Sequence, residues 1–301
     1  MTKTPDFIKP HDRVGVLAMA SQVNYESLTD GLNLMRNDWQ LEVVEGQTLK
    51  TNYHQFAGTD QQRIADLQTM LDDESLSAIF SARGGYGSSR IIDRLDFRKF
   101  RKKPKWIVGF SDITALHCHL HRFNVESIHG IMPKNFLLPQ FTEATESLRK
   151  LLFGQSQQYS TAPHPFNRLG MATGQLIGGN LCIIAHLIGS RSDLKTDGKI
   201  LFIEDIGEYH YNIDRMMVQL KRAKKLDKLA GLIIGNFTDI KDNNEVPFGK
   251  TVYEIIAEHT AEYDYPVCFD FPVGHGSQNV ALPVSRNVVF AVSKSGTCLQ
   301  I

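Results

Sequence analysis

The chain has 301 residues, 42% of them hydrophobic, so it can bury a large core, and its length favours two domains over one. Thirty-three basic and thirty-three acidic residues give no net charge, which argues against nucleic acid or an anionic membrane as a partner. No apolar run reaches the ~18 residues needed to span a bilayer. Residues 1–10 also lack the apolar stretch of a signal peptide. We therefore expect a cytoplasmic protein.

The N-terminal part alternates short apolar runs with amphipathic stretches, which is typical of a parallel sheet with crossover helices. Residues 61–71 predict one such helix, because Ile64, Leu67 and Leu71 fall at helical spacing and Thr59 or Asp60 is suited to cap it. The expected strands are residues 14–18, 41–44, 76–80 and 106–108. We predict an α/β fold whose N-terminal domain, residues 1–135, is a flavodoxin- or Rossmann-like parallel sheet.

Periodicity weakens after this domain. Residues 136–170 contain three prolines and a polar segment that begins with a glycine. This composition predicts a linker with one short helix over 143–152. Residues 171–301 form the expected C-terminal domain. Its predicted elements are a turn at 178–180 before an apolar helix, strands at 200–203 and 229–234, a helix at 213–223, and short strands from 266 onward.

A basic segment and the cysteines carry no functional signal. Residues 98–105 hold six Lys or Arg in eight positions, but they lack a series of stacking aromatics, so we expect a solvated helix end and loop. The four cysteines show no CxxC spacing for zinc or a redox pair, and four reduced thiols fit a reducing compartment. They are Cys118, Cys182, Cys268 and Cys298.

The most informative segment is Gly109-Phe110-Ser111-Asp112, where an apolar strand gives way to a helix-like run. A sharp strand-to-helix turn exposes a serine Oγ, and the first amides of the helix, including that of Asp112, point to where an oxyanion would form. An ordinary turn with an N-cap serine is the alternative.

A serine nucleophile needs a base and a group that orients the base. His275 lies between two glycines, where its imidazole has room to meet a partner, and Glu204 follows the apolar strand 200–203 at the start of an acidic turn. Glu208 is the rival acid. Each residue also has an ordinary structural reading, as a loop histidine or as a helix cap.

Two further groups of residues are candidates. Gly84, Gly85 and Gly87 let the backbone approach a ligand, although their spacing matches neither common nucleotide-binding motif. Arg83 beside them is suited to bidentate capture of a carboxylate. His117 and His121 are spaced as zinc ligands on a helix, but no acidic residue accompanies them as in HExxH, so we expect no metal and no cofactor.

These segments together resemble the LD-carboxypeptidase family of serine peptidases, which trims muropeptides in bacterial cell-wall recycling and includes the microcin C self-immunity peptidases. The resemblance covers nearly the whole chain and rests on six matches in the right order. They are FAGTD at 56–60, ARGGYG at 82–87, GFSDITAL at 109–116, GGNL at 178–181, LFIED at 201–205 with 214–215 and 219–221, and GH at 274–275 with Asn279 and 282–283.

The resemblance implies a Ser111, Glu204, His275 triad, in which Ser111 attacks, His275 is the base and then the acid, and Glu204 orients it. It also implies an oxyanion hole at the Gly85 and Asp112 amides, a C-terminal domain of β-barrel character, a homodimer, and release of the terminal D-alanine from a muropeptide. Arg83 is suited to bind the terminal carboxylate.

The chain departs from the family pattern at 18–21, where Ala-Met-Ala-Ser replaces Ala-Pro-Ser, and after Pro283, where Val284-Ser285 replaces a glycine. Because these positions are expected to shape the rim of the substrate-binding cleft, they leave the identity of the substrate less defined. A peptidyl-nucleotide substrate, as in the immunity branch, is one alternative, although the two tryptophans, Trp39 and Trp106, lie away from the segments that would hold a base. A non-catalytic peptide-binding protein is the other.

Overall fold

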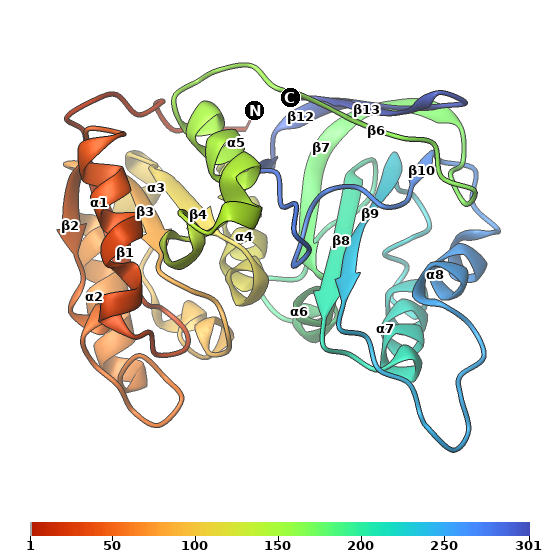
Figure 1. Cartoon of the computed structure of the whole chain (residues 1–301), viewed down its shortest axis with the longest axis horizontal. Helices are drawn as coiled ribbons and strands as arrows, with labels where there is room; N and C mark the ends of the chain where they lie inside the picture. Colours follow the sequence, from red (N-terminus) through yellow and green to blue (C-terminus); the bar gives the residue numbers. More distant parts are fainter. Residues whose placement is uncertain (1) are drawn as a thin grey trace. The chain divides into compact units, whose positions relative to one another are not determined.

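The computed structural model describes residues 2–301, which form two compact units. The N-terminal unit comprises residues up to 156 together with 279–285, and the C-terminal unit comprises 157–278 and 286–301. Within the segment expected to be a linker, α5 (Thr142–Leu152) matches the predicted short helix and belongs to the N-terminal unit. Figure 1 labels these elements along the chain.

The N-terminal unit contains a six-stranded sheet in the order β11-β5-β4-β3-β1-β2. Strands β1 to β5 pair in parallel, and β11 is antiparallel to β5. The predicted parallel sheet is therefore confirmed. The strands are β1 (Arg13–Leu17), β2 (Glu42–Glu45), β3 (Leu76–Ser81), β4 (Trp106–Gly109), β5 (Ser127–His129) and β11 (Leu282–Val284). The order 2-1-3-4-5 is that of flavodoxin-like folds, in which the direction of winding reverses between β1 and β3.

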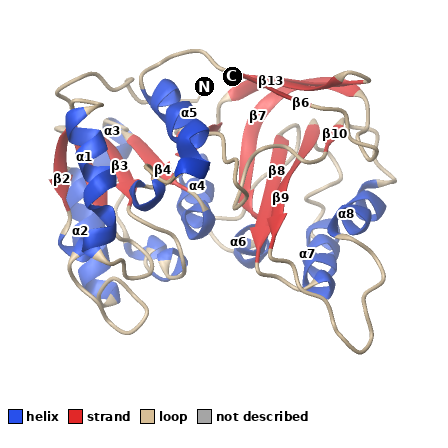
Figure 2. Cartoon of the chain, in the orientation of Figure 1, coloured by secondary structure: helices blue, strands red, loops and turns tan. Residues whose placement is uncertain are grey.

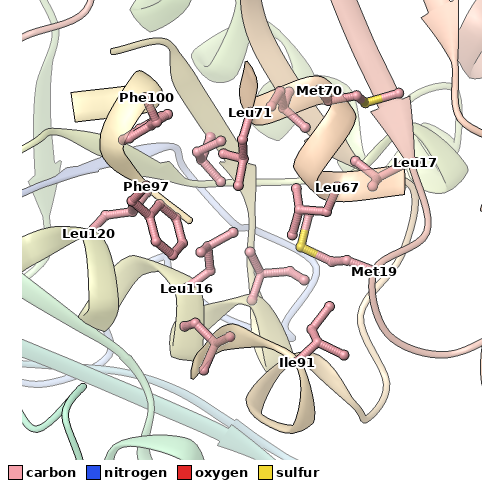
Figure 3. Packing of buried hydrophobic residues seen from close by; sticks show 14 of the residues in the cluster. Leu17, Met19, Leu67, Met70, Leu71, Ile91, Phe97, Phe100, Leu116 and Leu120 are labelled. Carbon is pink, nitrogen blue, oxygen red and sulfur yellow. The ribbon is translucent and has the colours of Figure 1, made fainter. Parts of the chain in front are cut away.

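Helices of this unit pack on the sheet through apolar faces. The predicted helix is α2 (Asp60–Asp72), and Thr59 begins it with a reciprocal capping box to Gln62. Leu67 and Leu71 of α2 join Leu17 of β1 in the buried core that Figure 3 shows. The remaining helices of the unit are α1 (Thr29–Asn37), α3 (Arg98–Lys102) and α4 (Thr114–His121).

The C-terminal unit contains a seven-stranded sheet in the order β10-β9-β8-β7-β12-β13-β6, drawn in red in Figure 2. β10, β9, β8 and β7 pair in parallel, whereas β12 pairs antiparallel with β7 and β13, and β6 pairs antiparallel with β13. Thr161 Oγ1 of β6 lies 3.9 Å from Cys268 Sγ of β10, so the two ends of the sheet come together, which gives it the expected barrel character. The strands are β6 (Gln158–Thr161), β7 (Gly170–Asn180), β8 (Ile200–Ile206), β9 (Gly231–Thr238), β10 (Val267–Cys268), β12 (Asn287–Ser293) and β13 (Gly296–Gln300).

The helices of this unit are α6 (Leu181–Leu187), α7 (His210–Arg222) and α8 (Val252–Thr260). Helix α8 was not among the predicted elements, although Thr251 begins it with a capping box to Glu254. No helix within residues 2–301 combines the length and apolarity needed to cross a membrane.

Three local expectations were wrong. The turn expected at 178–180 is the end of β7, because Gly178 and Gly179 lie against β8, and a Cβ on Gly178 would collide with the Phe202 carbonyl. The acidic turn expected from Glu204 is strand, since β8 continues to Ile206. Lys105 is not solvated: it is 2% exposed and donates to the Met70 carbonyl, and burial lowers its pKa to about 8.

Candidate active site

Ser111 lies in the N-terminal unit, at the turn that links β4 to α4. A single 3-10 turn over Ser111–Ile113 leads into the helix. Ser111 has a φ of +64°, a left-handed conformation that non-glycine residues rarely adopt and that is frequently found at functional sites. The sequence therefore places a strained serine where a nucleophile elbow would need one.

The glycine-rich turn after β3 packs directly against this serine. A Cβ on Gly84 would lie 3.0 Å from the Ser111 Cβ and 3.2 Å from its Oγ, so a side chain at this position would crowd the serine. Gly85 has a φ of +102°, and the neighbouring Tyr86 amide donates to Ser21 Oγ at 3.1 Å. Within residues 2–301, neither the Gly85 amide nor the Asp112 amide is paired with an acceptor. Both N–H groups are thus available to a ligand oxygen.

A buried polar network holds this turn in place. The Asp112 carboxylate accepts from the Ser88 amide at 2.8 Å, and the Asp112 carbonyl accepts from Ser88 Oγ at 2.6 Å. Arg63, fully buried in α2, donates to the Gly87 carbonyl at 2.8 Å and the Met19 carbonyl at 2.9 Å. Burial raises the pKa of Asp112, while the Ser88 hydrogen bonds and the Arg63 charge oppose the rise. The sequence analysis missed Arg63, whose signal is a charged residue on the core-facing stripe of α2.

Arg83 follows the same strand, β3, and is half-buried. Its Nη1 donates to the Gln22 carbonyl at 2.9 Å. Arg83 immediately precedes Gly84 in the sequence, and its guanidinium contacts the segment that follows β1.

Glu204 and His275 meet inside the C-terminal unit. The His275 Nδ1 lies 2.6 Å from Glu204 Oε2, and the Glu204 side chain is fully buried in β8. Gly274, with a φ of +116°, allows the loop to approach, since a Cβ there would lie 2.7 Å from the Glu204 Cβ. Burial alone would lower the pKa of His275, but the Glu204 hydrogen bond and charge, together with the Asp205 charge, raise it overall. Glu204 therefore fixes the ring and stabilises its protonated form.

The two neighbouring acids have other partners. Asp205 is buried and accepts from Asn180 Nδ2 at 2.8 Å and from the Cys182 amide at 2.9 Å. Burial and the adjacent Glu204 charge raise the pKa of Asp205 to about 7. Glu208 accepts a hydrogen bond from Asn212. Of the acids in this segment, Glu204 is thus the one whose carboxylate contacts His275 Nδ1.

The histidines considered as zinc ligands are hydrogen-bonded to neighbouring protein groups. His117 Nε2 donates to the Gly109 carbonyl and its Nδ1 accepts from Ser127 Oγ, each at 2.8 Å, and burial lowers its pKa to about 4. His121 Nδ1 lies 2.8 Å from Ser285 Oγ. Across residues 2–301 no three His, Cys, Asp or Glu side chains form a group that could hold a metal ion.

The structure thus sorts the expected site residues into two local groups. Ser111, Asp112, Gly85 and Arg83 lie together around the carboxyl ends of β3 and β4 in the N-terminal unit. Glu204 and His275 are hydrogen-bonded in the C-terminal unit.

Comparisons with known proteins find relatives that match nearly the whole chain. Residues 14–130 match the model of the LD-carboxypeptidase N-terminal domain, and residues 173–290 match that of the LD-carboxypeptidase C-terminal domain. The chain is 34% identical to a probable murein peptide carboxypeptidase of Bacillus subtilis, covering 98% of this chain and 94% of the relative. It is 31% identical to the murein tetrapeptide carboxypeptidase of Pseudomonas aeruginosa, covering 92% of each chain.

Solved structures share the fold. The muramoyltetrapeptide carboxypeptidase of Oxalobacter formigenes superposes with a TM-score of 0.86 at 24% identity, covering 96% of this chain and 98% of that one. The microcin C7 self-immunity protein MccF, in complex with aspartyl sulfamoyl adenosine, gives a TM-score of 0.87 at 20% identity, covering 100% of this chain and 98% of that one. Both family models match, and together they span most of the sequence, so the chain belongs to the LD-carboxypeptidase family of serine-type peptidases.

Proposed function

We propose that this carboxypeptidase releases the terminal D-alanine of muropeptide tetrapeptides by a Ser111, His275, Glu204 mechanism. The observation that carries the proposal is the 2.6 Å hydrogen bond between His275 Nδ1 and the buried Glu204 carboxylate. A buried acid on one ring nitrogen fixes the tautomer that a general base needs. The names of the Bacillus and Pseudomonas relatives support the murein substrate.

The proposed chemistry is acyl transfer in two steps. His275 Nε2 takes the Ser111 hydroxyl proton as Oγ attacks the carbonyl carbon before D-alanine, and the resulting oxyanion accepts hydrogen bonds from the Gly85 and Asp112 amides. The C–N bond then breaks, His275 gives its proton to the departing amine, and an acyl-serine remains. Water, deprotonated by His275, then attacks the ester carbonyl; the bond to Ser111 Oγ breaks, and His275 returns the proton to that oxygen.

Glu204 is the proposed orienting acid in preference to Glu208. Glu204 contacts the imidazole and is fully buried, whereas Glu208 is hydrogen-bonded to Asn212. A buried carboxylate without a positive partner is costly. The buried Glu204 carboxylate therefore stabilises the imidazolium that forms on His275 during each step.

We also propose that the enzyme works in the cytoplasm as a homodimer. The four cysteines are free thiols, as a reducing compartment would keep them. The dimer follows from the family resemblance, and light scattering of the purified protein tests it, since a monomer mass at micromolar concentration would contradict it.

A peptidyl-nucleotide substrate is less well supported. Nucleobases stack on aromatic side chains, and neither tryptophan offers an exposed ring, since Trp39 is 4% exposed and Trp106 is fully buried in the N-terminal unit. The similarity to MccF, at 20% identity, concerns the fold.

Mass spectrometry of L-Ala-γ-D-Glu-meso-diaminopimelate-D-Ala incubated with the enzyme, with and without a chelator, tests the proposal. We expect release of D-alanine that the chelator does not change, that Ser111→Ala abolishes, and that the control Ser89→Ala retains. An intact tetrapeptide after incubation with the wild-type enzyme would contradict the substrate. Substantial release by Ser111→Ala would contradict the mechanism.

A further inference from the structure

A pocket of about 630 Å³ opens in the N-terminal unit beside Arg83. Its lining includes Arg83, Lys50 and Lys134, together with the amide side chains of Asn24 and Asn52. No carboxylate is among the residues that line it. The pocket therefore combines three cations with neutral hydrogen-bonding groups, a composition suited to an anion.

The cations of this pocket differ in how far they are neutralised. Lys50 lies 3.6 Å from Glu45, whose carboxylate also pairs with Arg36 at 2.6 Å, and Lys50 sits 4.2 Å above the Tyr25 ring. Within residues 2–301, neither Arg83 nor Lys134 has a carboxylate at ion-pair distance. Their charges are thus available to a ligand.

A second pocket of the same unit provides a contrast. It measures about 590 Å³ and is lined by Lys9 and Lys103, but also by Asp6, Asp12 and Glu74. The two pockets have similar volumes. Acidic residues outnumber basic ones in this second pocket, whereas all the charged residues that line the Arg83 pocket are basic. The two pockets of this unit thus differ in charge.

The position of the Arg83 pocket also favours a ligand. Its lining comes from the segments that follow β1, β2, β3 and β5, so it lies at the carboxyl ends of these strands. The winding reverses between β1 and β3, and open parallel sheets bind ligands outside that point. Arg83 is followed by Gly84, which packs against Ser111. One residue of the pocket lining, Arg83, is therefore adjacent in the sequence to the glycine that packs against the proposed nucleophile.

We propose that this pocket binds a free carboxylate of the peptide substrate, with Arg83 and Lys134 as its main cations; this rests on the proposed function. A planar guanidinium matches a carboxylate with two parallel hydrogen bonds, and Lys134 adds a second positive charge. The tetrapeptide offers three kinds of carboxylate: that of the terminal D-alanine, the α-carboxylate of the γ-linked glutamate, and the side-chain carboxylate of diaminopimelate.

Steady-state kinetics with four peptides tests the pocket and identifies the carboxylate. The peptides are the free tetrapeptide and three derivatives, each amidated at one of those carboxylates. We expect Arg83→Gln and Lys134→Gln each to raise KM for the free tetrapeptide by about tenfold, the size typical of a charged hydrogen bond. Arg83→Lys should recover part of that loss because it keeps the charge. The control Lys103→Gln, in the other pocket, should leave KM unchanged.

Coupling between variant and peptide gives the decisive readout. For the amide that lacks the bound carboxylate, wild-type KM should already be raised about tenfold, and Arg83→Gln and Lys134→Gln should add little. Unchanged KM in both variants would overturn the pocket. So would an equal rise in KM for the free peptide and all three amides, since no carboxylate would then be coupled to these charges.

Calorimetric measurement of peptide binding tests the proposed pocket independently of the proposed catalytic function. The same peptides are titrated into Ser111→Ala, alone and combined with Arg83→Gln. If the wild-type enzyme fails to release D-alanine, the proposed function fails, and the pocket is judged by affinity alone. The pocket is supported if Arg83→Gln lowers the affinity only for peptides that keep one particular carboxylate. It is overturned if no peptide binds, or if Arg83→Gln leaves the affinity unchanged.

Discussion

The two units hold their buried acids in different ways. In the N-terminal unit, the Asp112 carboxylate beside Ser111 is balanced by hydrogen bonds from Ser88 and by the charge of the buried Arg63. In the C-terminal unit, Glu204 and Asp205 are adjacent buried carboxylates, and no Lys or Arg pairs with either within residues 2–301. His275 meets the charge of Glu204, whereas Asp205 accepts hydrogen bonds from Asn180 and the Cys182 amide.

This difference assigns separate tasks to the two regions. The serine region positions Ser111 with a strained backbone, close glycines and amide donors, and hydrogen bonds from Ser88 and the charge of Arg63 oppose the effect of burial on its Asp112 carboxyl. The Glu204 and His275 region raises the pKa of an imidazole, and it also raises that of Asp205 to about 7. We therefore expect the pH dependence of catalysis to originate in the C-terminal unit, while changes in the serine region alter the rate at all pH values alike.

The largest predicted effect is that of Glu204→Gln. Loss of the orienting carboxylate should lower kcat/KM by about 10³- to 10⁴-fold, the range seen when a triad acid becomes an amide. A base works unprotonated, so wild-type activity falls as pH drops through the raised pKa of His275. In Glu204→Gln the raising interaction is lost while burial remains, so this acidic limb should move to lower pH. A pH–rate profile with an unmoved limb would contradict the assignment.

Gly274→Ala should cost about 10²-fold in kcat/KM. A Cβ at position 274 would displace the Glu204 side chain, and small misplacements of catalytic groups have effects of this size. Gly207 is a matched control, because its φ of +74° is also positive but a Cβ there would meet nothing within 4 Å. Gly207→Ala should therefore show backbone strain as a lower melting temperature and nearly normal kinetics. Equal kinetic losses in both variants would show that backbone strain, and not the contact with Glu204, is responsible.

Ser88→Ala should lower kcat about tenfold without moving the acidic limb of the pH profile. The substitution removes the 2.6 Å hydrogen bond from Ser88 Oγ to the Asp112 carbonyl, which steadies the turn that carries Ser111. Ser89→Ala serves as the neighbouring control and should behave as wild type. A shift of the pH limb in Ser88→Ala would contradict the separation of tasks between the two regions.

Asp205→Asn should have the smallest effect on activity and a measurable one on stability against pH. The folded-state pKa of Asp205, about 7, lies above its ordinary value of 3.8, so its protonated form favours the folded state. That contribution is complete below about pH 4 and is lost as pH rises to about 7. Urea unfolding of Asp205→Asn should accordingly show a smaller decline in unfolding free energy than wild type between pH 4 and 7. An identical decline would mean that Asp205 does not titrate in this range.

Local signals made much of the N-terminal unit predictable. Apolar runs separated by amphipathic stretches predicted the parallel strands, and Thr59 with helical spacing predicted α2. Ser111 stood out because a glycine precedes it at the end of an apolar strand. These features depend on residues close together in the sequence, so the chain displays them directly.

Long-range contacts account for what was missed. Acidic residues are depleted in strands, yet β8 runs through Glu204 and Asp205, because His275 and Asn180, distant in sequence, satisfy their carboxylates. Arg63 supports the glycine turn from 24 residues away. Such partners emerge only when the chain is folded, which is why neither the extent of β8 nor the partners of Arg63 were predictable, although the position of Arg63 on the apolar stripe of α2 marked it as unusual.

The central claim is that Ser111 is a nucleophile activated by His275. The most direct test is the rate at which a fluorophosphonate labels the enzyme, with the modified residue located by peptide mass mapping, in wild type and in His275→Gln. We predict labelling of Ser111 in wild type and a rate lower by at least about 10²-fold in His275→Gln, the range of general base catalysis. Labelling of another residue, or an equal rate in His275→Gln, would contradict the account.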